Sequence, residues 1–329
     1  MTHFSTTTAL IALDWGTSSL RAYRFGHDGQ VLERRTLPWG IMQLPPAPTG
    51  QIDDDSHAGF RRALQAICGD WLQQAPGAAL IAAGMIGSKQ GWCEAPYLPT
   101  PRAIDAIGTT LTVQDTGLGT PLHIVPGLLQ NTALPNVMRG EETQVVGMLD
   151  LLQTDDMLIG LPGTHSKWVR VQARSIIHFD TFMTGEMYAA LSKHTILGRT
   201  MQTDGGSDDE AFLRGAAVAH SADGRAGLLS NMFSCRTLGL TGALSPSAQA
   251  DYLSGLLIGH EIAALLTLSQ DHGGLPQTLA LIGEDALCQR YRLALDLYGV
   301  AHVEIVANAT ERGLWKLASQ AGLLAPVSA

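Results

Sequence analysis

Cysteine is scarce in this chain of 329 residues: there are four, and no two lie close enough in sequence to form a paired metal-binding or redox motif. We interpret Cys68, Cys93, Cys235 and Cys288 as reduced thiols, the state typical of cytoplasmic proteins. Their small number argues against a disulfide-stabilised secreted scaffold and against a cysteine-based metal centre.

Hydrophobic runs are short as well, and none approaches the roughly 18 residues that a membrane-spanning helix needs. Residues 1–8 contain neither a basic flank nor an apolar stretch, so we expect no signal peptide. Acidic residues outnumber basic ones, and the formal net charge is −9. This deficit of positive charge argues against general affinity for nucleic acid. We therefore expect a soluble cytoplasmic protein without a membrane or nucleic-acid partner.

The overall composition is that of an ordinary globular protein, with 45% hydrophobic and 16% charged residues. The length is too great for one small core and suits two domains. A turn at residues 84–89 nearly mimics a phosphate loop, but the order Gly-Lys-Ser/Thr is absent, which excludes a P-loop fold.

The most informative stretch is residues 10–21, an apolar run that ends at Asp14 and continues through a small turn into a second apolar run. This pattern predicts strand, tight turn, strand. Gly16 allows a close approach of the backbone to a ligand, and the N–H groups with the hydroxyls of Thr17 and Ser18 can surround phosphate oxygens. Asp14 can hold a metal ion, directly or through water. An ordinary hairpin whose aspartate caps its own turn explains this stretch alone equally well.

A second copy of the pattern at residues 158–169 favours the phosphate-binding interpretation over the ordinary hairpin. Gly163 and Thr164 align with Gly16 and Thr17 after a one-residue gap. Copies about half a chain apart predict two related lobes, each with its own turn. Only the first copy has an aspartate, which favours one metal ion on the side of the first lobe. Two such turns facing across a cleft suit a nucleoside triphosphate better than a monophosphate.

With these motifs in place, the chain resembles the sugar-kinase branch of the superfamily that contains actin, hexokinase and heat-shock ATPases. Within that branch it is similar to the 2-dehydro-3-deoxygalactonokinases, and the similarity runs over nearly the whole chain. The segments that carry it are residues 14–18, 83–88, 91–92, 95–98, 137–144, 162–169, 183–186 and 253–259.

The resemblance implies an α/β, two-lobed actin-like ATPase (ribonuclease H-like) fold, with a mixed sheet flanked by helices in each lobe and a cleft between the lobes. We expect residues 1–140 to form the N-terminal lobe and residues 141–308 the C-terminal lobe. A closing helix within residues 309–329 is expected to pack back on the first lobe. The implied activity is transfer of phosphate from ATP, with Mg²⁺, to 2-dehydro-3-deoxy-D-galactonate, which gives the 6-phosphate in galactonate catabolism.

The predicted nucleotide-binding residues belong to three segments. The two turns are expected to hold the phosphates, and the resemblance puts the adenosine against the strand–helix turn near residue 283. A lysine in the second copy either reaches a phosphate or faces water. These candidates are Gly16, Thr17, Ser18, Gly163, Thr164, His165, Lys167 and Gly283.

The predicted contacts to the sugar acid follow a buried strand at residues 78–83 and precede the helix that starts near residue 141. The turn after the strand either binds substrate or is a surface turn, and the aromatic residues behind it form either a sugar platform or loop anchors. An arginine could hold the substrate carboxylate through two hydrogen bonds. The candidates are Gly84, Ser88, Lys89, Trp92, Tyr97 and Arg139.

Glu141 and Glu142 are the candidates for the base that takes the proton of the substrate hydroxyl. Acidic residues are also common in the first turn of a helix because they interact favourably with its dipole, so a structural role is an alternative. Hexokinase-like relatives use an aspartate at this place. Sequence does not decide which glutamate points into the cleft.

Three other functions stay open at this point. Another sugar or sugar-acid kinase, for example one acting on 2-keto-3-deoxygluconate, fits the same fold. A nucleotide-gated sugar sensor would carry a DNA-binding module, for which the stretch before the first strand leaves no room. An actin- or chaperone-like ATPase would bind protein. A homodimer is compatible with the sequence but not indicated by it.

Overall fold

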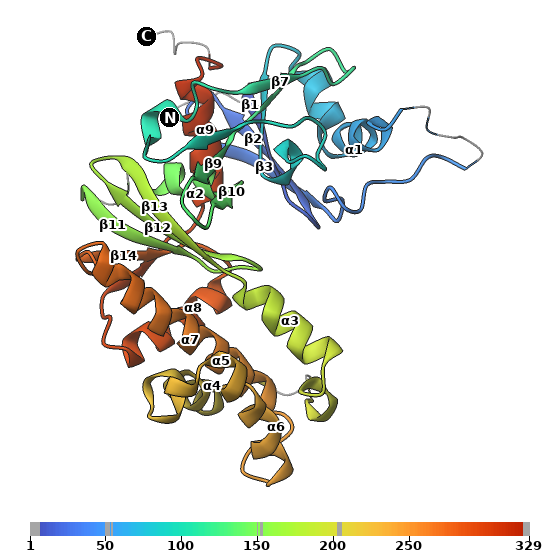
Figure 1. The fold of residues 1–329 in the computed structure, drawn as a ribbon. Coiled ribbons are helices and arrows are strands. Elements are labelled where there is room, and N and C mark those ends of the chain that lie inside the picture. The colour runs from blue at the N-terminus through green and yellow to red at the C-terminus, as the bar shows by residue number, and fades with distance from the viewer. Residues whose placement is uncertain are drawn as a thin grey trace, which may run out of the picture. The chain divides into compact units, whose positions relative to one another are not determined.

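The structure is a computed structural model that describes residues 7–49, 53, 55–149, 151, 154–202 and 206–324, and it forms two compact units (Figure 1). Unit 1 comprises Met1–Asp155, Gln172–His178 and Asn308–Ala329, and unit 2 comprises Asp156–Val171 and Phe179–Ala307. The division follows residue 155, whereas we expected it after residue 140. Residues 325–329 of the expected closing segment lie outside the described part of the chain.

The main sheet of unit 1 has the strand order β3-β2-β1-β4-β8-β7. β1 pairs antiparallel with β2 and parallel with β4, so that Asp14 stands opposite Arg21 on one side and Ala83 on the other. The strand, turn and strand predicted from residues 10–21 are therefore present as β1 and β2. The bounds are β1 Thr8–Trp15, β2 Leu20–Gly26, β3 Val31–Leu37, β4 Ala79–Ala83, β7 Thr112–Gln114 and β8 Leu122–Ile124.

Helix α1, Ala58–Gln74, buries an apolar stripe against this sheet. The first turn of α1 contains no acid, and its N-cap is His57. Asp53 instead forms an ion pair with Arg62 at 2.6 Å, and Asp55 forms one with Arg61. These acids therefore fix the entry to the helix through side-chain pairs and not through the dipole.

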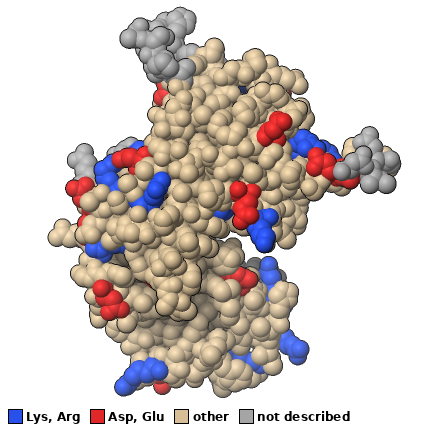
Figure 2. Space-filling model, turned by 45° about the horizontal axis from the view of Figure 1, so that its top comes forward, with Lys and Arg blue, Asp and Glu red and all other residues tan. Residues whose placement is uncertain are grey.

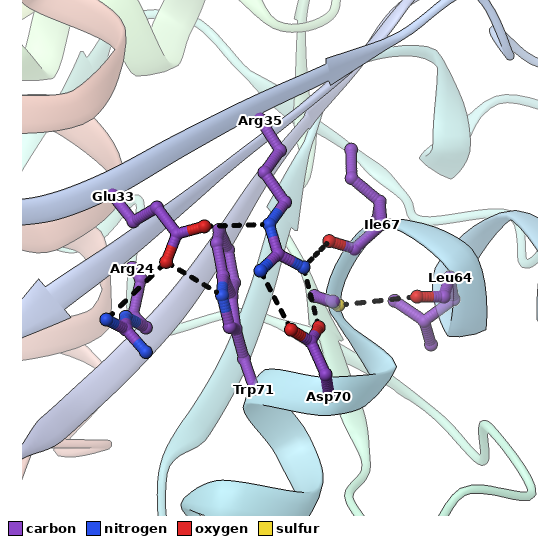
Figure 3. A network of polar contacts seen from close by, with 8 residues as sticks. Arg24, Glu33, Arg35, Leu64, Ile67, Asp70 and Trp71 are labelled. Atoms are coloured by element: carbon purple, nitrogen blue, oxygen red, sulfur yellow. Dashed lines mark hydrogen bonds and ion pairs between the residues drawn. The ribbon is translucent and has the colours of Figure 1, made fainter.

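Arg35 ties the edge strand β3 to α1 (Figure 3). Its Nη1 and Nη2 donate to the two carboxylate oxygens of Asp70 at 2.6 and 2.8 Å, and its Nε donates to Glu33 at 3.0 Å. The guanidinium lies 4.1 Å from the centre of the Trp71 ring, whose Nε1 donates to Glu33 at 3.2 Å. This network covers one edge of the sheet with charge, which disfavours pairing with another strand.

Two helices of unit 1 pack closely on one another: α2, Glu141–Met148, and α9, Ala309–Gln320. A Cβ atom at Gly147 would lie 1.8 Å from the carbonyl oxygen of Ala309, and one at Gly313 would lie 1.9 Å from that of Thr143. Because the two backbones touch, α2 belongs with unit 1.

Smaller elements complete unit 1. A second sheet has the order β10-β9-β5, and β6 pairs with Ser175 and Ile176 at the start of β13, which is why that segment clusters with unit 1. The bounds are β5 Tyr97–Pro99, β6 Arg102–Ala103, β9 Gly127–Gln130, β10 Asn136–Met138, with short 3₁₀ turns at Met85–Gly87 and Ile104–Ala106.

Unit 2 is built on the strand order β15-β14-β11-β12-β13, with β14 parallel to both β11 and β15. Its helices pack around a core that includes Trp168, Phe212 and Tyr291. The bounds are β11 Asp156–Leu161, β12 Ser166–Gln172, β13 Ser175–Phe182, β14 Thr278–Leu281, β15 Val303–Ile305, α3 Thr184–His194, α4 Asp209–Ala216, α5 Leu228–Asn231, α6 Phe233–Leu240, α7 Gln249–Asp271 and α8 Asp285–Leu297.

Helix α7 is the central helix of unit 2. By length and composition alone it could cross a membrane, but 56% of its apolar window is buried inside the protein, as is typical of a core helix. A Cβ atom at Gly255 would lie 1.9 Å from the carbonyl oxygen of Phe212, and one at Gly259 would lie 2.3 Å from that of Ala216. Small residues thus let α7 and α4 pack backbone to backbone.

Candidate active site

Asp14 lies near the end of β1, directly before the first predicted phosphate-binding turn. Its Oδ2 accepts a hydrogen bond from Nη1 of Arg21 at 3.0 Å. Burial raises the pKa of the Asp14 carboxyl, and the Arg21 guanidinium partly offsets that rise. The side chain keeps 23% exposure, so its carboxylate can still contact a ligand.

The first turn presents hydroxyl groups to solvent. The N–H group of Gly16 donates to the carbonyl of Ser19 at 2.9 Å, which closes the turn. Residues 40–42 pack on its carbonyl side and donate backbone N–H groups to the carbonyls of Gly16 and Thr17 at 3.0 and 3.2 Å. Thr17 and Ser18 remain exposed. The turn therefore has its carbonyls occupied and its hydroxyls available.

Three backbone segments of unit 1 converge beside Asp14. A Cβ atom at Gly84, just after β4, would lie 2.8 Å from the carbonyl oxygen of Trp15. One at Gly140, just before α2, would lie 3.2 Å from the Cα of Gly84. The end of β1, the predicted substrate turn and the first residues of α2 thus occupy one place in the unit.

Glu141 and Glu142 begin α2, but their carboxylates have different surroundings. Glu142 is fully buried, and both of its oxygens accept from the N–H group of Gly140, at 3.0 and 2.8 Å. Burial raises the pKa of Glu142 to about 8, and the negative charge of Glu141 adds to the rise. Glu141 is partly exposed, and its charge also raises the pKa of Asp14. The charge of Glu141 therefore acts on the Asp14 carboxyl, whereas Glu142 holds the N–H group at the start of its own helix.

Arg139 precedes these two acids and is buried, with 8% exposure. Its Nη2 donates to the carbonyl of Ala95 at 2.8 Å, and the guanidinium lies 4.3 Å from the centre of the Tyr97 ring. Among the described residues, its Nε and Nη1 have no hydrogen-bond partner. An arginine with two unpaired buried N–H groups is suited to receive the oxygens of an anion.

The other predicted substrate contacts differ in exposure. Ser88 is buried, and within the described part of the chain its Oγ has no partner, whereas Lys89 is exposed. Trp92 is 2% exposed and stacks on Phe60 with the ring centres 5.7 Å apart. The Trp92 ring therefore packs in the core as a loop anchor, and only Tyr97, at 38% exposure, could present a ring to a sugar.

The second turn, residues 162–165, connects β11 to β12 in unit 2. A Cβ atom at Gly185 would lie 2.3 Å from the carbonyl oxygen of Gly163, so the start of α3 packs directly on the turn. The N–H group of Glu186 donates to the carbonyl of Thr164 at 2.9 Å. Thr164 itself is exposed, and Gly163 has open space on its Cβ side.

Two further nucleotide-binding candidates of the second copy, His165 and Lys167, are both engaged by neighbouring groups. His165 pairs through its Nε2 with the carboxylate of Glu186, at an exposed position. Lys167 is only 4% exposed, and its Nζ donates to the carbonyl of His165 at 3.2 Å. Of the two alternatives that the sequence left for Lys167, the water-facing one is therefore excluded. The ammonium group lies against the backbone of the turn.

A cavity of about 460 Å³ opens beside the second turn. The residues that line it come from the turn, the start of α3, one side of α7 and the start of α8. They include both apolar and polar side chains. These residues are Gly163, Thr164, Thr184, Gly185, Tyr188, Asp251, Ser254, Leu257, Ile258, Glu284, Ala286, Leu287, Arg290 and Tyr291. A cavity of this size and mixed lining is typical of a small-molecule site.

The polar end of this cavity was not predicted from the sequence. Asp251 of α7 and Arg290 of α8 form an ion pair across 39 residues of chain, and Arg290 also lies over the ring of Phe212 at 5.3 Å. No local motif marks either residue. Only the packing of α7 beside α8 brings them to the same cavity.

Gly283, the predicted adenosine contact, precedes α8 and does not line the cavity itself. A Cβ atom there would lie 3.2 Å from the carbonyl oxygen of Pro162, so Gly283 lets the start of α8 approach the second turn. Glu284 caps α8 by accepting from the N–H groups of Ala286 and Leu287, at 3.1 and 3.0 Å. The carboxylate of Glu284 is thus engaged by its own helix.

The described residues contain no group of three or more His, Cys, Asp or Glu side chains arranged to hold a metal ion. Asp14 alone therefore suits a divalent cation only if other oxygens, from phosphate or water, complete its coordination. On the face shown in Figure 2, the described charged side chains are scattered, often with opposite signs adjacent, over a mostly uncharged surface.

Comparison with known proteins supplies the family. The family model described as 2-keto-3-deoxy-galactonokinase matches residues 14–317. A protein of Rhizobium meliloti (strain 1021), provisionally named a 2-dehydro-3-deoxygalactonokinase, is 35% identical over an alignment of 322 residues, and the match covers 93% of this chain and 97% of that protein. The 2-dehydro-3-deoxygalactonokinase of Escherichia coli (strain K12) is 32% identical over 294 residues, which are 89% and 91% of the two chains.

A crystal structure of a Sinorhizobium meliloti protein, also provisionally named a 2-dehydro-3-deoxygalactonokinase, superposes with a TM-score of 0.80. The two chains are 32% identical, and the match covers 97% of this chain and 98% of the other. Sheets flanked by helices, together with these similarities, confirm the predicted actin-like ATPase fold class.

Proposed function

Because the chain belongs to the 2-keto-3-deoxy-galactonokinase family, we propose that it transfers the γ-phosphate of ATP to the terminal hydroxyl of 2-dehydro-3-deoxy-D-galactonate and releases the 6-phosphate. The reaction serves D-galactonate catabolism in the cytoplasm. The observation that carries the proposal is the family match over residues 14–317, because this range contains every residue to which we assign a role.

The nucleotide is assigned to the cavity of unit 2. Its apolar residues, such as Leu257 and Ile258, suit the flat faces of a base, and the adjoining turn offers Gly163 and Thr164 to phosphate oxygens. The ammonium group of Lys167 donates a hydrogen bond to the backbone of this turn and places positive charge next to it. The exposed hydroxyls of Thr17 and Ser18 in unit 1 are assigned as further donors for phosphate oxygens.

Asp14 is the residue that would hold Mg²⁺, directly or through water. When bound, Mg²⁺ neutralises charge on the phosphate oxygens. Burial raises the pKa of the Asp14 carboxyl, and a bound cation would favour its ionised form.

Glu141 is assigned as the base, and Glu142 as the residue that holds the start of α2. Glu142 accepts the N–H group of Gly140 and, with a pKa near 8, is largely protonated at neutral pH. Glu141 is partly exposed, so it can contact a hydroxyl group, and its Oε2 accepts a hydrogen bond from the backbone N–H group of Arg139 at 3.0 Å. A carboxylate so placed can take the hydroxyl proton as phosphate is transferred.

The carboxylate of the sugar acid is assigned to Arg139. The unpaired Nε and Nη1 atoms of this buried side chain supply donors, and Ser88 Oγ is a further buried hydroxyl without a partner among the described residues. Burying such groups costs free energy unless a ligand pairs with them. Their preorganised position therefore favours an anionic substrate over a neutral sugar.

The test of the proposed reaction is ATP consumption with a panel of aldonic and 2-keto-3-deoxy acids. We expect 2-dehydro-3-deoxy-D-galactonate to give the highest kcat/KM, with 2-keto-3-deoxygluconate slower. Equal turnover without any acid would indicate a simple ATPase and contradict the proposal.

The nucleotide site has its own test in Ala286→Trp. This residue is exposed and lines the cavity, so an indole there fills the space without overpacking the core. We expect the KM for ATP to rise about tenfold or more, which corresponds to roughly 1.4 kcal/mol of binding free energy. Gln289→Trp, on an exposed face of the same helix outside the cavity, is the matched control and should leave the KM unchanged.

A further inference from the structure

Glu261 is a carboxylate buried in the middle of α7, with 3% exposure. Its Oε1 accepts a hydrogen bond from Nε1 of Trp168 at 2.7 Å. Its Oε2 accepts from the hydroxyl of Tyr291 at 2.7 Å and from the hydroxyl of Thr184. All three partners donate, so the two oxygens serve as the common acceptor of three elements.

Two of those elements line the nucleotide cavity, and the third adjoins the turn that lines it. Trp168 lies in β12, the strand that leaves the second turn, Thr184 is the first residue of α3, and Tyr291 belongs to α8. The hydroxyl of Tyr291 also bonds Ser166 Oγ at 2.9 Å, immediately after the turn. Thr184 and Tyr291 line the cavity, whereas Glu261 stands behind the lining and does not.

The stability of the fold alone does not explain why a carboxylate lies at this buried position. A buried carboxylate costs several kcal/mol of desolvation, which hydrogen bonds at best offset, and an apolar side chain of similar size is often as stable. Burial raises the pKa of the Glu261 carboxyl. Negative charge behind a triphosphate site also does not attract the ligand. The carboxylate does, however, join β12, α3 and α8, because each of them donates a hydrogen bond to this one side chain.

We propose that Glu261 is a positioning residue for nucleotide binding, which holds the second turn, the start of α3 and α8 in register so that the cavity is preorganised for ATP. This inference rests on the proposed function, because it takes the cavity as the nucleotide site. A cavity whose residues are already held in place loses less conformational entropy when the ligand binds, and its affinity for the ligand is therefore higher.

Glu261→Gln tests the inference with almost no change of shape. Only one amide oxygen can accept, so the amide nitrogen must face at least one of the three donors. We expect the full-length variant to fold and to bind the non-hydrolysable ATP analogue AMP-PNP, with Mg²⁺, about tenfold more weakly by calorimetry. The KM for the sugar acid should stay at the wild-type value. Trp168→Phe removes a single donor outside the cavity and should shift the affinity in the same direction by less.

Leu265→Ala is the matched control, because it removes core volume one turn farther along α7 without touching the network. We expect it to lower the thermal midpoint at least as much as Glu261→Gln and to bind AMP-PNP like the wild type. Wild-type affinity in Glu261→Gln, or an equal loss in Leu265→Ala, would overturn the positioning role alone. Failure of the wild-type protein to bind AMP-PNP would instead contradict the proposed function as well.

Discussion

Gly84 and Gly140 meet backbone to backbone in unit 1: a Cβ atom at Gly140 would lie 3.2 Å from the Cα of Gly84. Both have positive φ, 94° and 106°, a region that costs an L side chain on the order of 1–2 kcal/mol. Gly84 follows β4 and Gly140 precedes α2, so this contact sets where Glu141 stands beside the end of β1.

Gly140→Ala should therefore reduce both stability and activity. The added methyl group meets unfavourable φ and the backbone of Gly84, so we expect about 1–2 kcal/mol of lost unfolding free energy and a kcat at least tenfold lower. Gly119→Ala is the control, because its φ is also positive, at 85°, but nothing lies within 4 Å of its Cβ position. Wild-type kcat in both variants would show that the contact does not matter for catalysis.

Asp14→Asn tests the metal role. We expect kcat to fall about a thousandfold or more, because the variant lacks the carboxylate to which we assign Mg²⁺, while cooperative thermal unfolding is retained. Activity should be measured over a series of Mg²⁺ concentrations. Asp28→Asn, in the exposed β2–β3 turn, is the matched control. Full activity in Asp14→Asn at low Mg²⁺ would remove Asp14 from the metal site.

Glu141→Gln and Glu142→Gln separate the base from the helix cap. We expect Glu141→Gln to lower kcat about a hundredfold or more with little change in the KM for either substrate. Glu142→Gln should keep kcat within about tenfold of the wild type, because an amide oxygen can still accept the N–H group of Gly140. The reverse order of effects would assign the base to Glu142.

The buried Glu142 carboxyl also predicts a pH dependence of stability. Its pKa rises from the usual 4.5 to about 8 in the folded protein, so the stability it contributes is complete below about pH 4.5 and is lost as pH rises through 8. Glu142→Gln does not ionise. The unfolding free energy of the wild type should therefore fall relative to the variant between pH 5 and 8, by at most roughly 1.4 kcal/mol per pH unit. Urea unfolding at several pH values measures this difference, and parallel curves would contradict it.

Arg139→Ala tests the anion contact. We expect the KM for the sugar acid to rise about tenfold or more, because the guanidinium is a charged donor in a buried place, while the KM for ATP stays unchanged. Arg174→Ala removes an exposed arginine that pairs with Asp105, and it is the matched control. An unchanged KM for the acid in Arg139→Ala would rule out this anchor.

The sequence predicted most of the elements because their signals are local. The apolar run before Asp14 and the two Gly-Thr turns each carry their own pattern of apolar and turn residues. The family resemblance, also read from local motifs, predicted the fold class and the family correctly.

Features that depend on long-range packing were not predictable in this way. The division after residue 155 follows from Gly147 and Gly313, which join α2 to α9 across about half of the chain. Lys167 is buried only because the second turn folds over it, and Asp251 meets Arg290 only because α7 packs beside α8. Nothing near these residues in sequence specifies such neighbours.

The most direct test of the proposed reaction is identification of its product. Purified protein incubated with ATP, Mg²⁺ and 2-dehydro-3-deoxy-D-galactonate should release one ADP per molecule of acid consumed. Phosphorus–proton correlation by NMR should then place the new phosphate on the C6 oxygen. Phosphate on another oxygen, or ADP formed with free inorganic phosphate and unchanged acid, would contradict the assignment.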